Sequence, residues 1–113
     1  MQIATREVYD VLVVDMSGKL DTGTSGEASD QLVKIVQGDI KQIVLNLDKL
    51  DYVSSAGLRI ILRTSKLLQG GRGELKLCHA NGVVKEVLET SGFNSLLKVY
   101  DAEKDAVTAF SSP

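Results

Sequence analysis

The stretch that decides the fold is LDYVSSAGLRIILR, residues 50–63. Its polar first part predicts a loop, and its second part begins a strongly amphipathic helix from about Ser55 to Gln69. Apolar and small residues recur at helical spacing on the inner side of this helix, at Leu58, Ile61, Leu62, Ser65 and Leu68. Three basic residues, Arg59, Arg63 and Lys66, share its outer face.

Two adjacent serines, Ser54 and Ser55, stand where the loop becomes the helix. A hydroxyl at a helix start lies beside the free backbone N–H groups and the positive end of the helix dipole. Such a hydroxyl can cap the helix, act as a nucleophile or accept a phosphate. The sequence leaves these three uses open at this point.

Strands and helices alternate on both sides of this stretch. Upstream, strands are expected at 3–7, 11–16 and about 43–47, with a hairpin turn at Tyr9-Asp10. Downstream, Gly70–Gly73 ends the helix and leads to strands at 75–78 and 96–100. Three more helices are expected. The first starts at Thr24, which has capping-box spacing to Glu27, has an apolar face of Ala28, Leu32, Ile35 and Val36, and ends at Gly38. The second starts at Asn81, with Val84, Val87 and Leu88 inward, and ends at Gly92, and the third starts at Asp101 and carries Ala102, Ala106 and Phe110.

The resulting order, β-β-α-β-α-β-α-β-α, predicts an α/β fold with one domain over residues 1–113. The sheet is expected to be mixed and mostly parallel, with one antiparallel hairpin at its start. Functional loops in such sheets gather at the carboxyl ends of the strands. The loops at 18–25 and 48–54 are therefore expected to lie side by side.

Composition narrows the class of protein. The 113 residues include 43% hydrophobic and 25% charged residues, which is typical of a globular domain. Thirteen basic and fifteen acidic residues leave a net charge of −2, without the basic excess of a nucleic-acid-binding or membrane-surface protein. The single cysteine, Cys78, cannot form an internal disulfide, and no signal peptide or segment of membrane-spanning length is apparent. We expect a cytoplasmic protein that is monomeric when free.

The chemistry of an enzyme is poorly represented. Neither serine lies in a Gly-x-Ser-x-Gly turn, and the only histidine, His79, is expected to be a partly buried strand-end residue satisfied by the backbone. One cysteine beside one histidine does not have metal-ligand spacing. The glycines at 70–73 follow a helix and precede a strand, the reverse of a phosphate-binding loop. The sequence predicts no cofactor, no metal and no catalytic activity.

The basic stripe of Arg59, Arg63 and Lys66 has two interpretations. It can be an ordinary solvated helix face, or a docking surface for an acidic partner beside the serines. Its position next to Ser55 makes the second interpretation about as strong as the first.

The same residues carry a resemblance to the STAS-domain family, specifically to small single-domain anti-sigma factor antagonists. The similarity covers essentially the whole chain and is most specific at SGKLD (17–21), IVLNL (43–47), VSSAGL (53–58) and SGF (91–93). It implies the α/β sheet fold inferred above. It also implies a partner switch, in which an anti-sigma factor with serine kinase activity binds the unmodified antagonist and releases a sigma factor. Phosphorylation of the antagonist ends this binding, and a serine phosphatase restores it.

By this resemblance the phosphate acceptor is Ser55, with Ser54 as the alternative. The implied partner-binding residues include one in the neighbouring loop and a run at the helix start, together with the basic stripe; they are Asp21, Ser54, Ser55, Ala56, Gly57, Leu58, Arg59, Arg63 and Lys66. Many family members have Asp where this chain has Ser54, and a second serine where it has Ala56. Other STAS domains are constitutive subunits of stress-sensing assemblies or lipid transporters, which is the alternative function.

Overall fold

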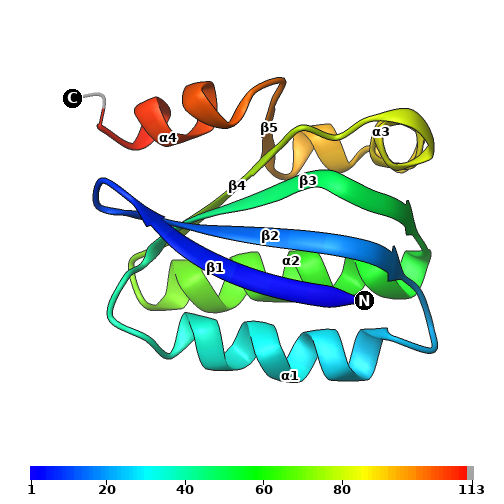
Figure 1. Cartoon of the computed structure of the whole chain (residues 1–113), viewed down its shortest axis with the longest axis horizontal. Coiled ribbons are helices and arrows are strands. Elements are labelled where there is room, and N and C mark those ends of the chain that lie inside the picture. Colours follow the sequence, from blue (N-terminus) through cyan, green and yellow to red (C-terminus); the bar gives the residue numbers. More distant parts are fainter. Residues whose placement is uncertain (112–113) are drawn as a thin grey trace.

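A computed structural model of the chain describes residues 1–111 and contains one five-stranded sheet with four α-helices (Figure 1). The strands are β1 (Gln2–Val8), β2 (Val11–Leu20), β3 (Gln42–Val53), β4 (Glu74–Cys78) and β5 (Lys98–Tyr100). The helices are α1 (Ser25–Val36), α2 (Ser55–Gly70), α3 (Gly82–Thr90) and α4 (Glu103–Ser111), with a short 3₁₀ helix, η1, at Phe93–Ser95. The predicted order of elements is confirmed, and η1 is the addition.

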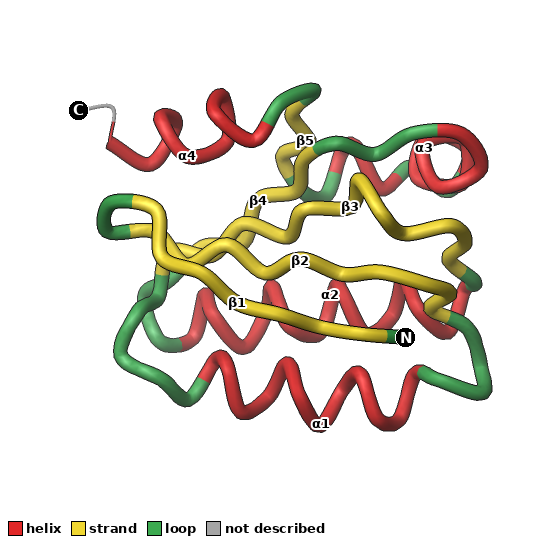
Figure 2. The backbone as a smooth tube through the Cα atoms, in the orientation of Figure 1, coloured by secondary structure: helices red, strands yellow, loops and turns green. Residues whose placement is uncertain are grey.

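The five strands lie in the sheet in chain order, β1-β2-β3-β4-β5. The pair β1–β2 is antiparallel and the other three pairs are parallel, as predicted. Helices α1 and α2 lie next to each other on one face of the sheet, and α4 lies on the opposite face (Figures 1 and 2). Helices α1 and α2 both begin at the carboxyl ends of the strands, so their first turns are neighbours.

The central strands bury side chains on both faces, which explains their nearly continuous apolar sequence. On β3, Ile43 and Leu45 contribute to the larger core under α1 and α2, while Val44 between them contributes to the smaller core under α4. The same alternation on β4 places Leu77 in the larger core and Cys78 in the smaller one. Sheet alternation therefore divides the hydrophobic residues between two layers of helices.

The strands that carry the candidate site are longer than predicted. β2 continues to Leu20 and β3 to Val53, so the first three residues of the predicted loop at 18–25 and all but Ser54 of the predicted loop at 48–54 belong to strands. The two extensions pair with each other, from Ser17↔Lys49 to Leu20↔Val53, through two irregularities that include Gly18 at φ +97°. This pairing satisfies backbone groups in segments whose side chains do not favour a strand. Only residues 21–24 and Ser54 remain between strand and helix.

Thr24 and Asn81 occupy the predicted N-cap positions of α1 and α3, but neither side chain makes a capping hydrogen bond, and Asp101 does not directly precede α4. Thr24 precedes α1, but its hydroxyl donates to the Lys19 carbonyl (2.8 Å) and accepts from the Asp21 N–H. Asn81 precedes α3, yet its amide donates to the Asp48 carbonyl (3.2 Å). α4 begins at Glu103 rather than directly after Asp101, and the Glu103 N–H donates to Nε2 of His79 at 3.1 Å.

His79 is half-buried at the end of β4 and bonded to backbone, so the expectation for this residue is confirmed. The last strand is shorter than the predicted 96–100, because Leu96 and Leu97 form a turn after η1 in which both N–H groups donate to the Phe93 carbonyl. The glycines after α2 do end the helix. Gly73 lies so close to the backbone before β3 that a Cβ there would be 2.3 Å from the Lys41 carbonyl oxygen.

The inner stripe of α2 differs slightly from the prediction. Leu62, which was predicted to face inward, is only half-buried, whereas Thr64, which was not, is buried. The Thr64 hydroxyl donates to the Ile60 carbonyl at 2.8 Å, which satisfies it inside the helix.

Lys76 is a charged residue that the sequence did not mark as special. It lies under α4 with 2% of its surface exposed. Its ammonium pairs with Glu74 at 2.9 Å and lies 4.6 Å from the centre of the Phe110 ring. The ion pair and the aromatic face together compensate for taking this charge out of water.

Candidate functional site

Ser54 and Ser55 have different environments at the junction of β3 and α2. The Ser54 hydroxyl accepts a hydrogen bond from the Gly57 N–H at 3.3 Å, and its extended backbone conformation is that of an N-cap. Ser55 is the first residue of α2 and is exposed. Within residues 1–111 its hydroxyl has no hydrogen-bond partner. Ser54 is therefore the cap, and Ser55 presents a free hydroxyl at the surface.

The start of α2 is fixed against the end of β2. The Ser54 N–H donates to the Leu20 carbonyl at 2.9 Å, which places Asp21 beside the serines. Asp21 is half-buried, and its Oδ1 accepts hydrogen bonds from the backbone N–H groups of Gly23 (2.9 Å) and Thr24 (3.2 Å). One carboxylate oxygen of Asp21 thus holds the 21–24 turn in place.

The predicted partner-binding residues divide into a surface group and a supporting group. Ser55, Arg59, Arg63 and Lys66 are exposed on one side of α2, and Asp21, Ser54 and Ala56 are half-buried. Gly57 and Leu58 are buried. The last two support the surface from below, so no direct contact with a partner is expected of them.

The exposed charges of α2 are basic, whereas those in the first two turns of α1 are acidic and Lys34 in its last turn is basic. The basic stripe of α2, defined as Arg59, Arg63 and Lys66, forms no ion pair within residues 1–111. The first two turns of α1 expose Glu27 and Asp30. No ion pair joins the two helices in this part of the chain, so both sets of charges are free to face a partner.

The one histidine is not placed to act as a general base for Ser55. His79 is engaged with α4 on the opposite face of the sheet, and no group of three or more His, Cys, Asp or Glu side chains within residues 1–111 could hold a metal ion. The arrangement supplies a hydroxyl, two sets of charges and a rigid frame.

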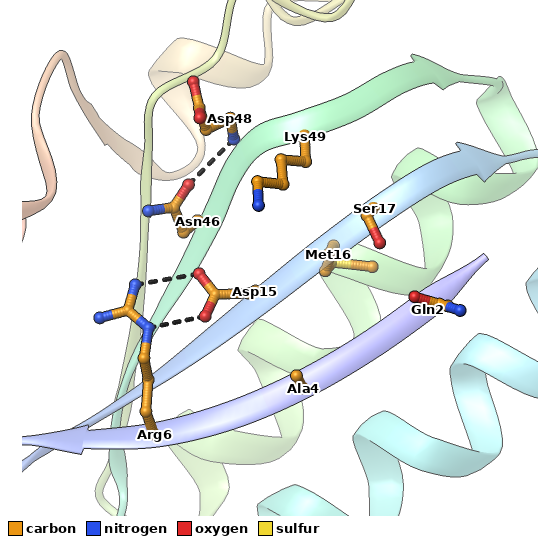
Figure 3. Close-up of a pocket in the computed structure, with 9 residues that line it drawn as sticks. All are labelled: Gln2, Ala4, Arg6, Asp15, Met16, Ser17, Asn46, Asp48 and Lys49. Carbon is orange, nitrogen blue, oxygen red and sulfur yellow. Dashed lines mark hydrogen bonds and ion pairs between the residues drawn. The ribbon is translucent and has the colours of Figure 1, made fainter.

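A second polar region, which the sequence did not reveal, is an open pocket of about 450 Å³ on the face that α4 leaves uncovered (Figure 3). Arg6 donates to both carboxylate oxygens of Asp15, at 2.7 and 3.0 Å, and also to Glu103 of α4. Asn46 donates to the same Glu103 carboxylate at 2.9 Å.

The hydrogen bonds that Arg6 donates to Asp15 and then to Glu103 raise the pKa of its guanidinium, and the bond from Arg6 lowers the pKa of Glu103. Arg6 is shared between the carboxylates of Asp15 and Glu103, and its bonds to Glu103, with that from Asn46, fix α4 to the sheet. No sequence signal could have joined residues 6, 15, 46 and 103.

Comparison with known proteins agrees with this geometry. The STAS domain model matches residues 2–106. The anti-sigma F factor antagonist of Paenibacillus polymyxa is 35% identical over 109 residues, covering 96% of this chain and 93% of that protein. BtrV of Bordetella bronchiseptica, named provisionally as an anti-sigma factor antagonist, is 34% identical over 110 residues, covering 97% of this chain and 95% of that protein.

Solved structures show the same fold at lower identity. An anti-sigma factor antagonist from Mycobacterium paratuberculosis superposes with a TM-score of 0.90 at 21% identity, covering 98% of this chain and 94% of that one. The antagonist SpoIIAA in its unphosphorylated form has a TM-score of 0.80 at 20% identity, covering 97% and 96%. SpoIIAA of Bacillus has also been solved in its phosphorylated form, with a TM-score of 0.71 at 19% identity over 96% and 99%.

The family model over residues 2–106 identifies the chain as a STAS domain, and the mixed five-stranded sheet agrees with the fold of the solved antagonists. The chain belongs to the STAS family, and its curated relatives are named anti-sigma factor antagonists. Within residues 1–111 no helix is both long enough and apolar enough to cross a membrane.

Proposed function

We propose that this chain is an anti-sigma factor antagonist whose binding is switched off by phosphorylation of Ser55. Two curated relatives that are more than 30% identical over nearly the whole chain carry names of this kind. The observation that carries the proposal is the division of labour between the two serines. Ser54 is occupied as the helix cap, while Ser55 is exposed and has no partner among the described residues 1–111.

The partner in this proposal is an anti-sigma factor with serine kinase activity, and a serine phosphatase reverses the modification. The surface of this chain that the anti-sigma factor contacts is formed by Asp21, the start of α2 and the basic stripe. The stripe favours an acidic patch on the partner, and the exposed Glu27 and Asp30 of α1 favour a basic patch beside it.

Phosphorylation would change this surface without unfolding it. A phosphate brings a charge of about −1.5 to −2 at neutral pH. The start of a helix tolerates this charge because of its dipole and free N–H groups. A hundredfold change in partner affinity requires only about 2.7 kcal/mol, which one opposed charge in an interface can supply.

The test is incubation of the purified chain with its anti-sigma factor and ATP, followed by mass spectrometry. We expect one phosphate, located on Ser55 and absent from Ser55→Ala, with Ser54→Ala as the matched control that is still modified. Phosphate that persists in Ser55→Ala, or no phosphate at all, contradicts the proposal.

Binding measurements give a second readout. Ser55→Asp is expected to bind the anti-sigma factor at least tenfold more weakly, whereas Ser55→Ala binds like the parent and no longer responds to ATP. If Ser55→Asp binds as tightly as the parent, charge is not what ends the interaction. A stable complex with other STAS proteins or with a transporter, formed without any kinase, would instead indicate a constitutive subunit.

A further inference from the structure

Ser55 and Arg59 lie one helical turn apart on the exposed side of α2, and neither side chain has a partner within residues 1–111. We propose that Arg59 binds the phosphate of phosphorylated Ser55 within the same helix. Arg59 would thereby be withdrawn from the partner surface at the moment of modification. This inference rests on the proposed function, since it concerns the modified form of Ser55.

The spacing of the two residues suits this pairing. Side chains four residues apart are neighbours on a helix, and an anion that precedes a cation by four residues is the more favourable orientation. A phosphate offers three acceptor oxygens, and the planar guanidinium of arginine can donate two parallel hydrogen bonds to them.

Arg59 is the one member of the basic stripe that is near enough. Arg63 is eight residues from Ser55, which is about 12 Å along the helix axis, and Lys66 is farther. The first turn of α2 contains no acidic residue to compete for Arg59. By contrast Arg6, which is also partly exposed, is already held by Asp15 and Glu103.

The pairing changes what a partner encounters. The unmodified stripe presents three positive charges on one face of α2. After modification, the phosphate offsets about 1.5 to 2 of these charges and occupies the hydrogen-bond donors of Arg59. The partner loses an arginine as well as meeting a negative charge, so both effects weaken the same contact.

The test places phosphoserine at position 55 by codon suppression, so that no kinase is needed. The second pKa of the phosphate is then measured by ³¹P NMR titration in the parent, in Arg59→Gln and in the matched control Arg63→Gln. Because pairing with arginine stabilises the dianion, we expect Arg59→Gln to raise this pKa by about 0.3 pH unit. Arg63→Gln should leave it within about 0.1 unit of the parent value.

Equal pKa values in the parent and in Arg59→Gln would overturn the inference, as would equal shifts in the two variants. Both arginines are exposed, so neither variant should fail to fold. The titration needs no kinase, so its failure can be told apart from failure of the proposed function. If no kinase modifies Ser55 the function fails, while the titration still decides whether Arg59 binds a phosphate there.

Discussion

The backbone carbonyl of Leu20 lies directly against Gly57. A Cβ on Gly57 would be 2.7 Å from the Leu20 carbonyl oxygen and 2.8 Å from its Cγ. The same carbonyl accepts the hydrogen bond from the Ser54 N–H. The first turn of α2 is thus seated on the last residue of β2, and this contact holds Ser55 beside the 21–24 turn.

Substitution of Gly57 tests this seating. Gly57→Ala should destabilise the fold by about 1–3 kcal/mol, because the atoms that a methyl group would meet are backbone and core side chains that cannot move away freely. Gly70→Ala is the control in the same helix, since no atom lies within 4 Å of its Cβ position. It should be neutral or stabilising by up to about 1 kcal/mol. Urea denaturation measures both, and equal effects would contradict the close approach.

The roles of the two serines can be separated by their effect on stability. Ser54→Ala removes the side chain that accepts the Gly57 N–H, and it should lower the free energy of unfolding by about 1 kcal/mol. Ser55→Ala removes a hydroxyl that bonds to nothing in the described part of the chain, and it should change the free energy of unfolding by less than about 0.5 kcal/mol. Thermal unfolding followed by circular dichroism distinguishes the two. Equal losses would mean that the hydroxyls share the cap.

The elements of this fold could be predicted because each leaves a local signal. The amphipathic pattern of α2 and the apolar run of β3 depend only on neighbours in sequence. The extensions of β2 to Leu20 and β3 to Val53 depend on pairing between two polar segments about thirty residues apart, which no local pattern encodes.

Dependence on residues far apart in the sequence also explains the helix caps and the smaller core under α4. Thr24, Asn81 and His79 hydrogen-bond according to what the fold brings near them. At the candidate site, the sequence already showed the two adjacent serines at the start of the helix and the basic stripe on its outer face. The burial of Gly57 and Leu58 beneath the exposed surface was not.

Glu103 should make stability depend on pH. Because Arg6 holds the pKa of Glu103 below its ordinary value of 4.5, the carboxylate stabilises the fold above pH 4.5. This stabilisation is lost as the pH falls through the lower pKa of the folded state.

At pH 7, Glu103→Gln should therefore lower the free energy of unfolding by about 1 kcal/mol, discounted for the partial exposure of Arg6. The difference should shrink below pH 4.5. Urea titrations from pH 7 to pH 3 follow it, with the exposed Glu86→Gln as the control that changes little. A difference that does not depend on pH would show that the charge of Glu103 is unimportant.

The rate at which the Cys78 thiol is labelled should show whether α4 detaches while the rest of the fold stays intact. Its side chain is fully buried in the smaller core with Ala106 and Val107 of α4, and burial raises the pKa of its thiol to about 12. The thiolate is the reactive form, so a disulfide reagent at pH 7–8 should label native Cys78 at least a hundredfold more slowly than the unfolded chain.

If detachment of α4 is what exposes the thiol, Glu103→Gln should label about fivefold faster, which corresponds to the loss of about 1 kcal/mol in the contacts that hold the helix. Opening of one helix also exposes little surface, so the labelling rate should rise only slightly at low urea concentrations. Glu86→Gln should label at the parent rate. A urea dependence as steep as that of equilibrium unfolding would contradict local opening, because Cys78 would then be reached only when the whole sheet comes apart.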